Sequence, residues 1–114
     1  MKDYSKMSDF EVIGYVSMYE HGFSWIEFDD EMSSHVKCGN EGSPGFAIVE
    51  VKDYCNNPSD AWTTIIENSI TFNYDTAQVH VGSYFSDTAK VSANRSKALR
   101  AAMIVYLMMK DGEK

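Results

Sequence analysis

The sequence has no apolar run long enough to cross a membrane. Its longest uninterrupted run covers the nine residues from Ala101 to Met109, about half the length that a bilayer requires. No apolar stretch follows the charged residues near Met1, so we expect no secretory signal. Proline is scarce, with two residues, whereas 44% of the chain is hydrophobic. This composition predicts a globule, and the length of 114 residues predicts a single domain, residues 1–114.

Cysteine and histidine are also few, so few residues could bind a metal ion or form disulfide bonds. The two cysteines, Cys38 and Cys55, are expected to be free thiols of a cytoplasmic protein. His35 and Cys38 are the only close pair of metal-binding residue types, and His80 is remote in sequence. A structural zinc site usually needs two such close pairs. We therefore predict no metal and no cofactor.

Basic residues are scarce over most of the chain. Residues 1–89 contain four lysines and 15 acidic residues, a net charge of −11, whereas residues 90–114 carry +4. We expect no direct binding to nucleic acid, because that affinity depends on neutralising phosphates. The basic residues before and within the last helix are expected to pair with acidic residues of the first segment. They are Lys90, Arg95, Lys97 and Arg100.

A first helix is predicted from Asp9 to Tyr19. Ser8 with Glu11 three residues later forms a capping box, and both precede an apolar-periodic stretch. Gly22 supplies the left-handed residue that ends many helices. Gly14 in the interior weakens the helix and indicates that another element approaches closely there.

A second helix begins at the Asn57-Pro58 pair. Asn57 is the expected cap, and Pro58 stands at the first helical position, where its missing N–H is not needed. The helix is expected to end near Asn68. Its predicted inward stripe consists of Trp62, Ile65 and Ile66.

Aromatic and β-branched residues predict several short strands. Residues 23–28 form one, and a weaker one lies near residues 35–37. Residues 46–51 are nearly all apolar, so we predict a central strand with both faces covered. Residues 70–74 and 78–84 alternate and are expected to form a hairpin. The polar segment after them, Ser86–Asn94, is predicted to be a mobile loop.

The last helix, expected from Arg95 to Asp111, is apolar nearly all round between Ala101 and Met109. A single buried face does not account for such a pattern. Either the helix crosses the centre of the core, or its outer face contacts a second subunit in a homodimer. The elements together predict an α+β fold, in which a small, mainly antiparallel sheet of three to five strands packs against two helices, with a third, N-terminal helix at its edge.

A binding surface is predicted around the first strand. Trp25 is the better candidate for an exposed binding aromatic, because Trp is common in interface hot spots. It is followed by the acidic residues Glu27, Asp29, Asp30 and Glu31. These acids lack the spacing of a calcium-binding loop. We therefore interpret the segment as a surface for a partner protein.

Cys55 is the alternative reactive group. It precedes a helix N-terminus, where a thiolate is favoured. His21, His35 or His80 could act as its base, although nothing in the sequence places one of them beside it. A small Cys/His-dependent enzyme is therefore a second hypothesis.

Three segments resemble the NinX-like family of small proteins from lambdoid phages and prophages. They are residues 3–11, residues 55–62 with 65–68, and residues 100–109. The resemblance implies an origin among early phage accessory genes and expression inside a bacterial cell. It implies no reaction, so no catalytic residue is carried over.

We expect a phage or prophage accessory protein in the host cytoplasm that binds a host or phage protein without catalysing a reaction. One form of this hypothesis is DNA mimicry, because the −11 charge of residues 1–89 could imitate phosphates. The alternatives are the Cys/His enzyme and a structural protein that forms homo-oligomers through the last helix.

Overall fold

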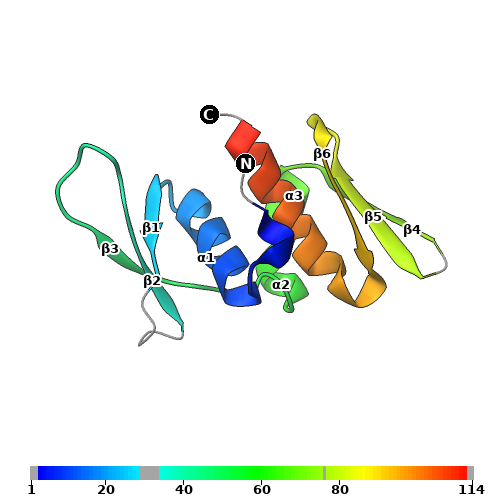
Figure 1. Ribbon diagram of the computed structural model, residues 1–114, viewed down its shortest axis with the longest axis horizontal. Coiled ribbons are helices and arrows are strands. Elements are labelled where there is room, and N and C mark those ends of the chain that lie inside the picture. Colours follow the sequence, from blue (N-terminus) through cyan, green and yellow to red (C-terminus); the bar gives the residue numbers. More distant parts are fainter. Residues whose placement is uncertain (1–2, 29–33, 76, 113–114) are drawn as a thin grey trace.

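In the residues that the structure describes, the fold consists of three α-helices and two small antiparallel sheets (Figure 1). The computed structural model describes residues 3–28, 34–75 and 77–112. The elements in chain order are η1 (Tyr4–Lys6), α1 (Asp9–Glu20), β1 (Trp25–Glu27), β2 (His35–Gly39), β3 (Ala47–Glu50), α2 (Pro58–Glu67), β4 (Ile70–Tyr74), β5 (Gln78–Ser83), β6 (Ser86–Asn94), η2 (Arg95–Lys97) and α3 (Ala98–Gly112). The predicted α+β class is confirmed, but the strands form two sheets instead of one.

The two sheets lie at opposite ends of an elongated molecule of 48 × 28 × 24 Å, and the helices lie between them (Figure 1). Strands β1, β2 and β3 form sheet A, in that order, and β4, β5 and β6 form sheet B. Every pairing is antiparallel. The hairpin predicted from residues 70–74 and 78–84 is confirmed as β4 and β5. No partner was predicted for the other strands, which is why the division into two sheets was missed.

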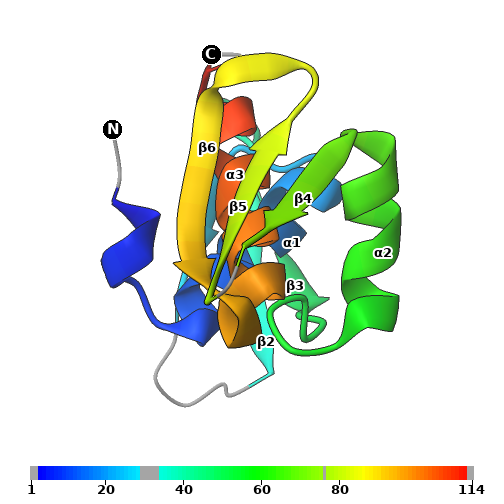
Figure 2. The same cartoon turned by 90° about the vertical axis from the view of Figure 1, so that its right-hand side faces the viewer.

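Helix α3 is the centre of the larger core. All of its residues from Ala101 to Leu107 are buried, and it packs against α1, α2 and sheet B. Figure 2 shows α3 behind the strands of sheet B. The interpretation of the last helix as a central core helix is confirmed. The homodimer remains a prediction.

A second, smaller core lies between sheet A and α1. Its buried residues are Met18 of α1 with Val36, Cys38 and Val49 of the sheet. Helix α1 is thus covered on two sides, by α3 and by sheet A. The close approach predicted at Gly14 is confirmed, since a Cβ there would lie 2.5 Å from Cε1 of Phe28.

The local signals at the helix ends are also confirmed. Ser8 and Glu11 form the reciprocal capping box at the start of α1. The side chain of Asn57 accepts a hydrogen bond from the N–H of Ser59, with Pro58 in the first helical turn. Gly22 has the positive φ of 77° expected after α1. These signals depend on a few neighbouring residues, so the sequence contains them in full.

The predicted inward stripe of α2 was wrong for two of its three residues. Trp62 and Ile66 are 61% and 56% exposed, and only Ile65 is buried. The buried positions are Ala61, Thr64 and Ile65. The true stripe is displaced by one residue because small side chains at Ala61 and Thr64 allow α2 to lie close to its neighbours.

Two predictions about strands were also wrong. Residues 46–51 do not form a central strand, because β3 lies at an edge of sheet A and Phe46 and Ile48 are 60% and 51% exposed. Ser86–Asn94 is not a loop but strand β6. The inward-pointing side chains of β6 are small, and Ala89 among them is buried. The polar residues between them hid the alternation of apolar and polar side chains along the strand.

None of the helices in the described parts of the chain combines the length and the apolar character that a membrane span needs.

Candidate functional site

The outer face of sheet A brings together the predicted binding residues Trp25 and Glu27. The register places Trp25 opposite Gly39 and Glu27 opposite Lys37. On the other side of β2, Lys37 is opposite Ile48. Side chains of directly opposed residues point to the same face of a sheet. These residues therefore form one continuous surface, directed away from α1.

Trp25 is half-buried, not fully exposed. Its indole ring lies against Gly39, where an added Cβ would collide with three ring atoms. The lack of a side chain at Gly39 lets the ring lie flat on the neighbouring strand. The Trp25 ring is consequently packed against its own sheet.

Lys37 links the charged and apolar parts of this face. Its ammonium lies 3.8 Å from a carboxylate oxygen of Glu27 and 4.4 Å from the centroid of the Phe46 ring. Ile48 of β3 and Phe46, which directly precedes this strand, contribute exposed apolar area. The sequence did not assign Lys37, Phe46 or Ile48 to a site. The four consecutive apolar residues from Phe46 to Val49 hid which of them face outward, and Lys37 lies in a strand that was only weakly predicted.

The remaining residues of the predicted binding segment, Asp29, Asp30 and Glu31, lie outside the described residues. The surface defined here, the sheet A face, consists of Trp25, Glu27, Lys37, Phe46 and Ile48.

Cys55 is not the activated thiol that its position before α2 suggested. It is buried in the larger core. Burial, with a further contribution from the charge of Asp9, raises the pKa of the Cys55 thiol to about 12, although nearby Arg100 opposes this effect. Cys38 is buried as well, and burial raises its pKa. Both cysteines are free thiols, as predicted.

Two of the described histidines contact side chains other than that of Cys55. His35 contacts the hydroxyl of Ser34, and His80 contacts Asp75 and Ser92. In the described residues, no three or more His, Cys, Asp or Glu side chains gather as metal ligands would.

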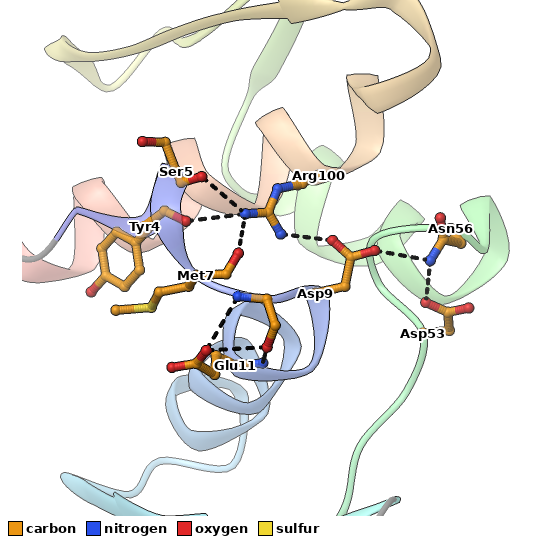
Figure 3. A network of polar contacts seen from close by, with 9 residues as sticks. Tyr4, Ser5, Met7, Asp9, Glu11, Asp53, Asn56 and Arg100 are labelled. Atoms are coloured by element: carbon orange, nitrogen blue, oxygen red, sulfur yellow. Dashed lines mark hydrogen bonds and ion pairs between the residues drawn. The ribbon is translucent and has the colours of Figure 1, made fainter.

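Arg100 at the start of α3 forms a polar network with the beginning of the chain (Figure 3). Its Nη1 donates to a carboxylate oxygen of Asp9 at 2.6 Å, and Nη2 donates to the backbone carbonyls of Tyr4, Ser5 and Met7. The predicted pairing of a basic residue near the last helix with an acid of the first segment is confirmed for Arg100. A guanidinium whose two terminal nitrogens are both engaged in this way serves the fold.

The same network reaches the segment before α2. The amide of Asn56 donates to the second carboxylate oxygen of Asp9 at 3.5 Å and to Asp53 at 3.1 Å (Figure 3). The three segments that resemble the NinX-like family therefore meet around Asp9. A family model described as "Bacteriophage P22, NinX" matches residues 3–110. The chain belongs to this phage family. No curated protein and no solved structure matches it.

The NinX match includes sheet A and sheet B as well as the three segments that meet at Asp9. The family name gives a phage origin and no reaction. The segments that first suggested the family hold η1, α1 and α3 together, so they mark the fold. A binding site must then be sought on surfaces that the fold leaves uncovered, and the sheet A face is such a surface.

Proposed function

We propose that this phage protein is an accessory protein that binds a host or phage protein through the sheet A face. The observation that carries the proposal is the exposed aromatic and aliphatic area of Phe46 and Ile48 beside the packed ring of Trp25. An apolar centre with charged residues at its rim is the usual composition of a protein interface.

The charge of the chain favours a partner with a basic contact surface. The net charge is −7, and Glu27 and Glu50 accompany the apolar residues on sheet A. Opposite charges accelerate association and exclude unsuitable partners. DNA mimicry receives less support, since several acids are used within the fold: Asp9 pairs with Arg100, Asp75 with His80, and Asp111 accepts from Tyr4.

The test is affinity capture from phage-infected cells, with the tagged chain as bait and quantitative mass spectrometry as readout. The double variant Phe46→Ser with Ile48→Ser should lose a stoichiometric partner. A matched control, Trp62→Ser with Ile66→Ser, removes an equally exposed apolar pair from α2 and should retain it. Loss with the α2 variant alone would place the site on α2 and contradict the proposal.

Sedimentation of the isolated protein distinguishes a second copy from a different partner. If the sheet A face binds a different protein, the isolated chain should be a monomer at micromolar concentration. A dimer that the sheet A variant dissociates would make self-association the role of this face.

A further inference from the structure

Asp75, His80 and Ser92 form a connected acid–imidazole–hydroxyl line on the outer face of sheet B. His80 of β5 lies directly opposite Ser92 of β6. Its Nδ1 is 2.7 Å from the Ser92 Oγ, and its Nε2 is 2.9 Å from the Asp75 Oδ2. This is the connectivity of a Ser–His–Asp triad, with the two ring nitrogens used in the reverse order.

The contacts of Asp75 determine where the imidazole proton lies. Its Oδ1 accepts hydrogen bonds from the N–H groups of Ala77 and Gln78, at 3.3 and 3.2 Å. The hydrogen bond from His80, together with these N–H groups, lowers the pKa of Asp75. An ionised carboxylate only accepts, so neutral His80 carries its proton on Nε2. Nδ1 is then free to accept the proton of the Ser92 hydroxyl.

A hollow of about 290 Å³ adjoins this line of residues, and His80 and Ser92 are part of its lining. Asn73, Gly82 and Lys90 line it as well. Gly82 keeps the hollow open because it has no side chain there. The amide of Asn73 and the ammonium of Lys90 are hydrogen-bond donors on the same hollow, and an oxyanion needs such donors.

We propose that Ser92, His80 and Asp75 form an acyl-transfer site that hydrolyses small carboxylic esters with a good leaving group. Ser92 Oγ attacks the carbonyl carbon, and its proton passes to His80 Nδ1. The tetrahedral intermediate collapses, the C–O bond to the leaving group breaks, and Nδ1 returns the proton to the leaving oxygen. Water then attacks the acyl-serine with the same base, which releases the carboxylic acid and restores Ser92.

The test uses p-nitrophenyl acetate as the probe, with release of p-nitrophenolate as the signal. We expect Ser92→Ala to lower the rate above background about 100-fold, the lower end of what general-base catalysis contributes. Ser86→Ala is the matched control, since Ser86 is on the same strand but contacts Thr88 instead of a histidine. It should leave the rate unchanged.

A serine-directed fluorophosphonate provides a second readout. Peptide mass spectrometry should locate the adduct on Ser92, and His80→Gln should abolish labelling while the circular dichroism spectrum stays unchanged. A wild-type rate equal to that of Ser92→Ala, or an adduct spread over other serines, would overturn the proposal. The three residues would then only join the strands of sheet B.

Asp75 is a positioning residue in this scheme, because its carboxylate holds the imidazole proton on His80 Nε2. An asparagine amide can donate to Nε2 instead, which places the proton on Nδ1 and leaves Ser92 without its base. Asp75→Asn should therefore lower kcat as Ser92→Ala does and leave KM unchanged. An unchanged kcat would contradict this role. The outcome is independent of the sheet A face.

Discussion

Arg100 and Asp9 form an ion pair of 2.6 Å that joins the start of α3 to the start of α1, 91 residues apart in sequence. The Arg100 side chain is 15% exposed, and its Nη2 group donates to backbone carbonyls of η1 and of Met7. One side chain therefore holds the first and last helices and the N-terminal turn in a fixed arrangement.

Arg100→Met should lower the free energy of unfolding by about 2 kcal/mol. The substitution retains most of the aliphatic length but leaves Asp9 and the carbonyl groups without their donor. Urea denaturation followed by circular dichroism measures the effect. Lys97→Met, at an exposed position one turn earlier, serves as control and should change the value by less than about 0.5 kcal/mol. Equal midpoints for the two variants would contradict the structural role of Arg100.

Tyr4→Phe should lower the free energy of unfolding at neutral pH. The variant should also lose less of this free energy than the wild type as the pH becomes alkaline. The Tyr4 hydroxyl donates to Asp111 at 2.5 Å, and burial, followed by this carboxylate, raises the pKa of Tyr4. The folded protein then holds the Tyr4 proton more tightly than the unfolded chain does. This stabilisation is complete below pH of about 10 and declines as the pH rises above it.

Urea titrations at pH 7 and at several values up to pH 11 test this dependence on Tyr4. At pH 7 the variant should be less stable by about 1.5–3 kcal/mol, the value of a hydrogen bond to a charged group. Tyr84→Phe, at an exposed position, should follow the wild-type curve. If the stability of Tyr4→Phe falls in parallel with that of the wild type up to pH 11, Tyr4 does not cause the loss of stability at alkaline pH.

Cys55 should resist alkylation in the native protein. With a pKa of about 12, its thiolate fraction at pH 8 is about three orders of magnitude below that of a free cysteine. Iodoacetamide labelling followed by peptide mass spectrometry should show little modification of Cys55 until urea is added. Rapid labelling of Cys55 in the folded protein would instead support the Cys/His enzyme hypothesis.

Gly14→Ala should destabilise the protein although alanine favours helices. The new Cβ would meet the ring of Phe28 at 2.5 Å, and overpacking of this kind costs about 1–3 kcal/mol. The double variant with Phe28→Leu should recover part of the loss in thermal unfolding, because the shorter side chain makes room. Gly112→Ala, where nothing lies within 4 Å, is the control. Additive effects of Gly14→Ala and Phe28→Leu would exclude the contact as the cause.

The parts of the fold that the sequence predicted are those that neighbouring residues determine. Ser8 with Glu11, and Asn57 with Pro58, begin their helices through contacts within one turn. Trp62 was misplaced because two apolar stripes on α2 differ by one residue, and only its packing against other elements selects the one with Ala61. The division into two sheets arises because β3 and β4, with α2 between them in the chain, belong to different sheets. The alternation within a strand does not determine which neighbour it pairs with.

The candidate sites show the same limit. Trp25 and Glu27 were predicted from their types, but Lys37 and Ile48 joined them only through the register of sheet A. His80 was considered as a base for Cys55. Its actual neighbours are Asp75, from a turn, and Ser92, from strand β6. Because of its polar composition, this strand was predicted to be a loop.

The central position of α3 also determines when the chain can fold during its synthesis. Helix α1 leaves the ribosome first, but the residues that complete its environment, Arg100 and the buried segment Ala101–Leu107, are made last. The strands of each sheet pair between segments close in sequence, so their hairpins can form earlier. The larger core closes only after α3 has emerged. Until then, the nascent chain exposes the apolar side of α1, and exposed apolar surface of this kind is prone to aggregate.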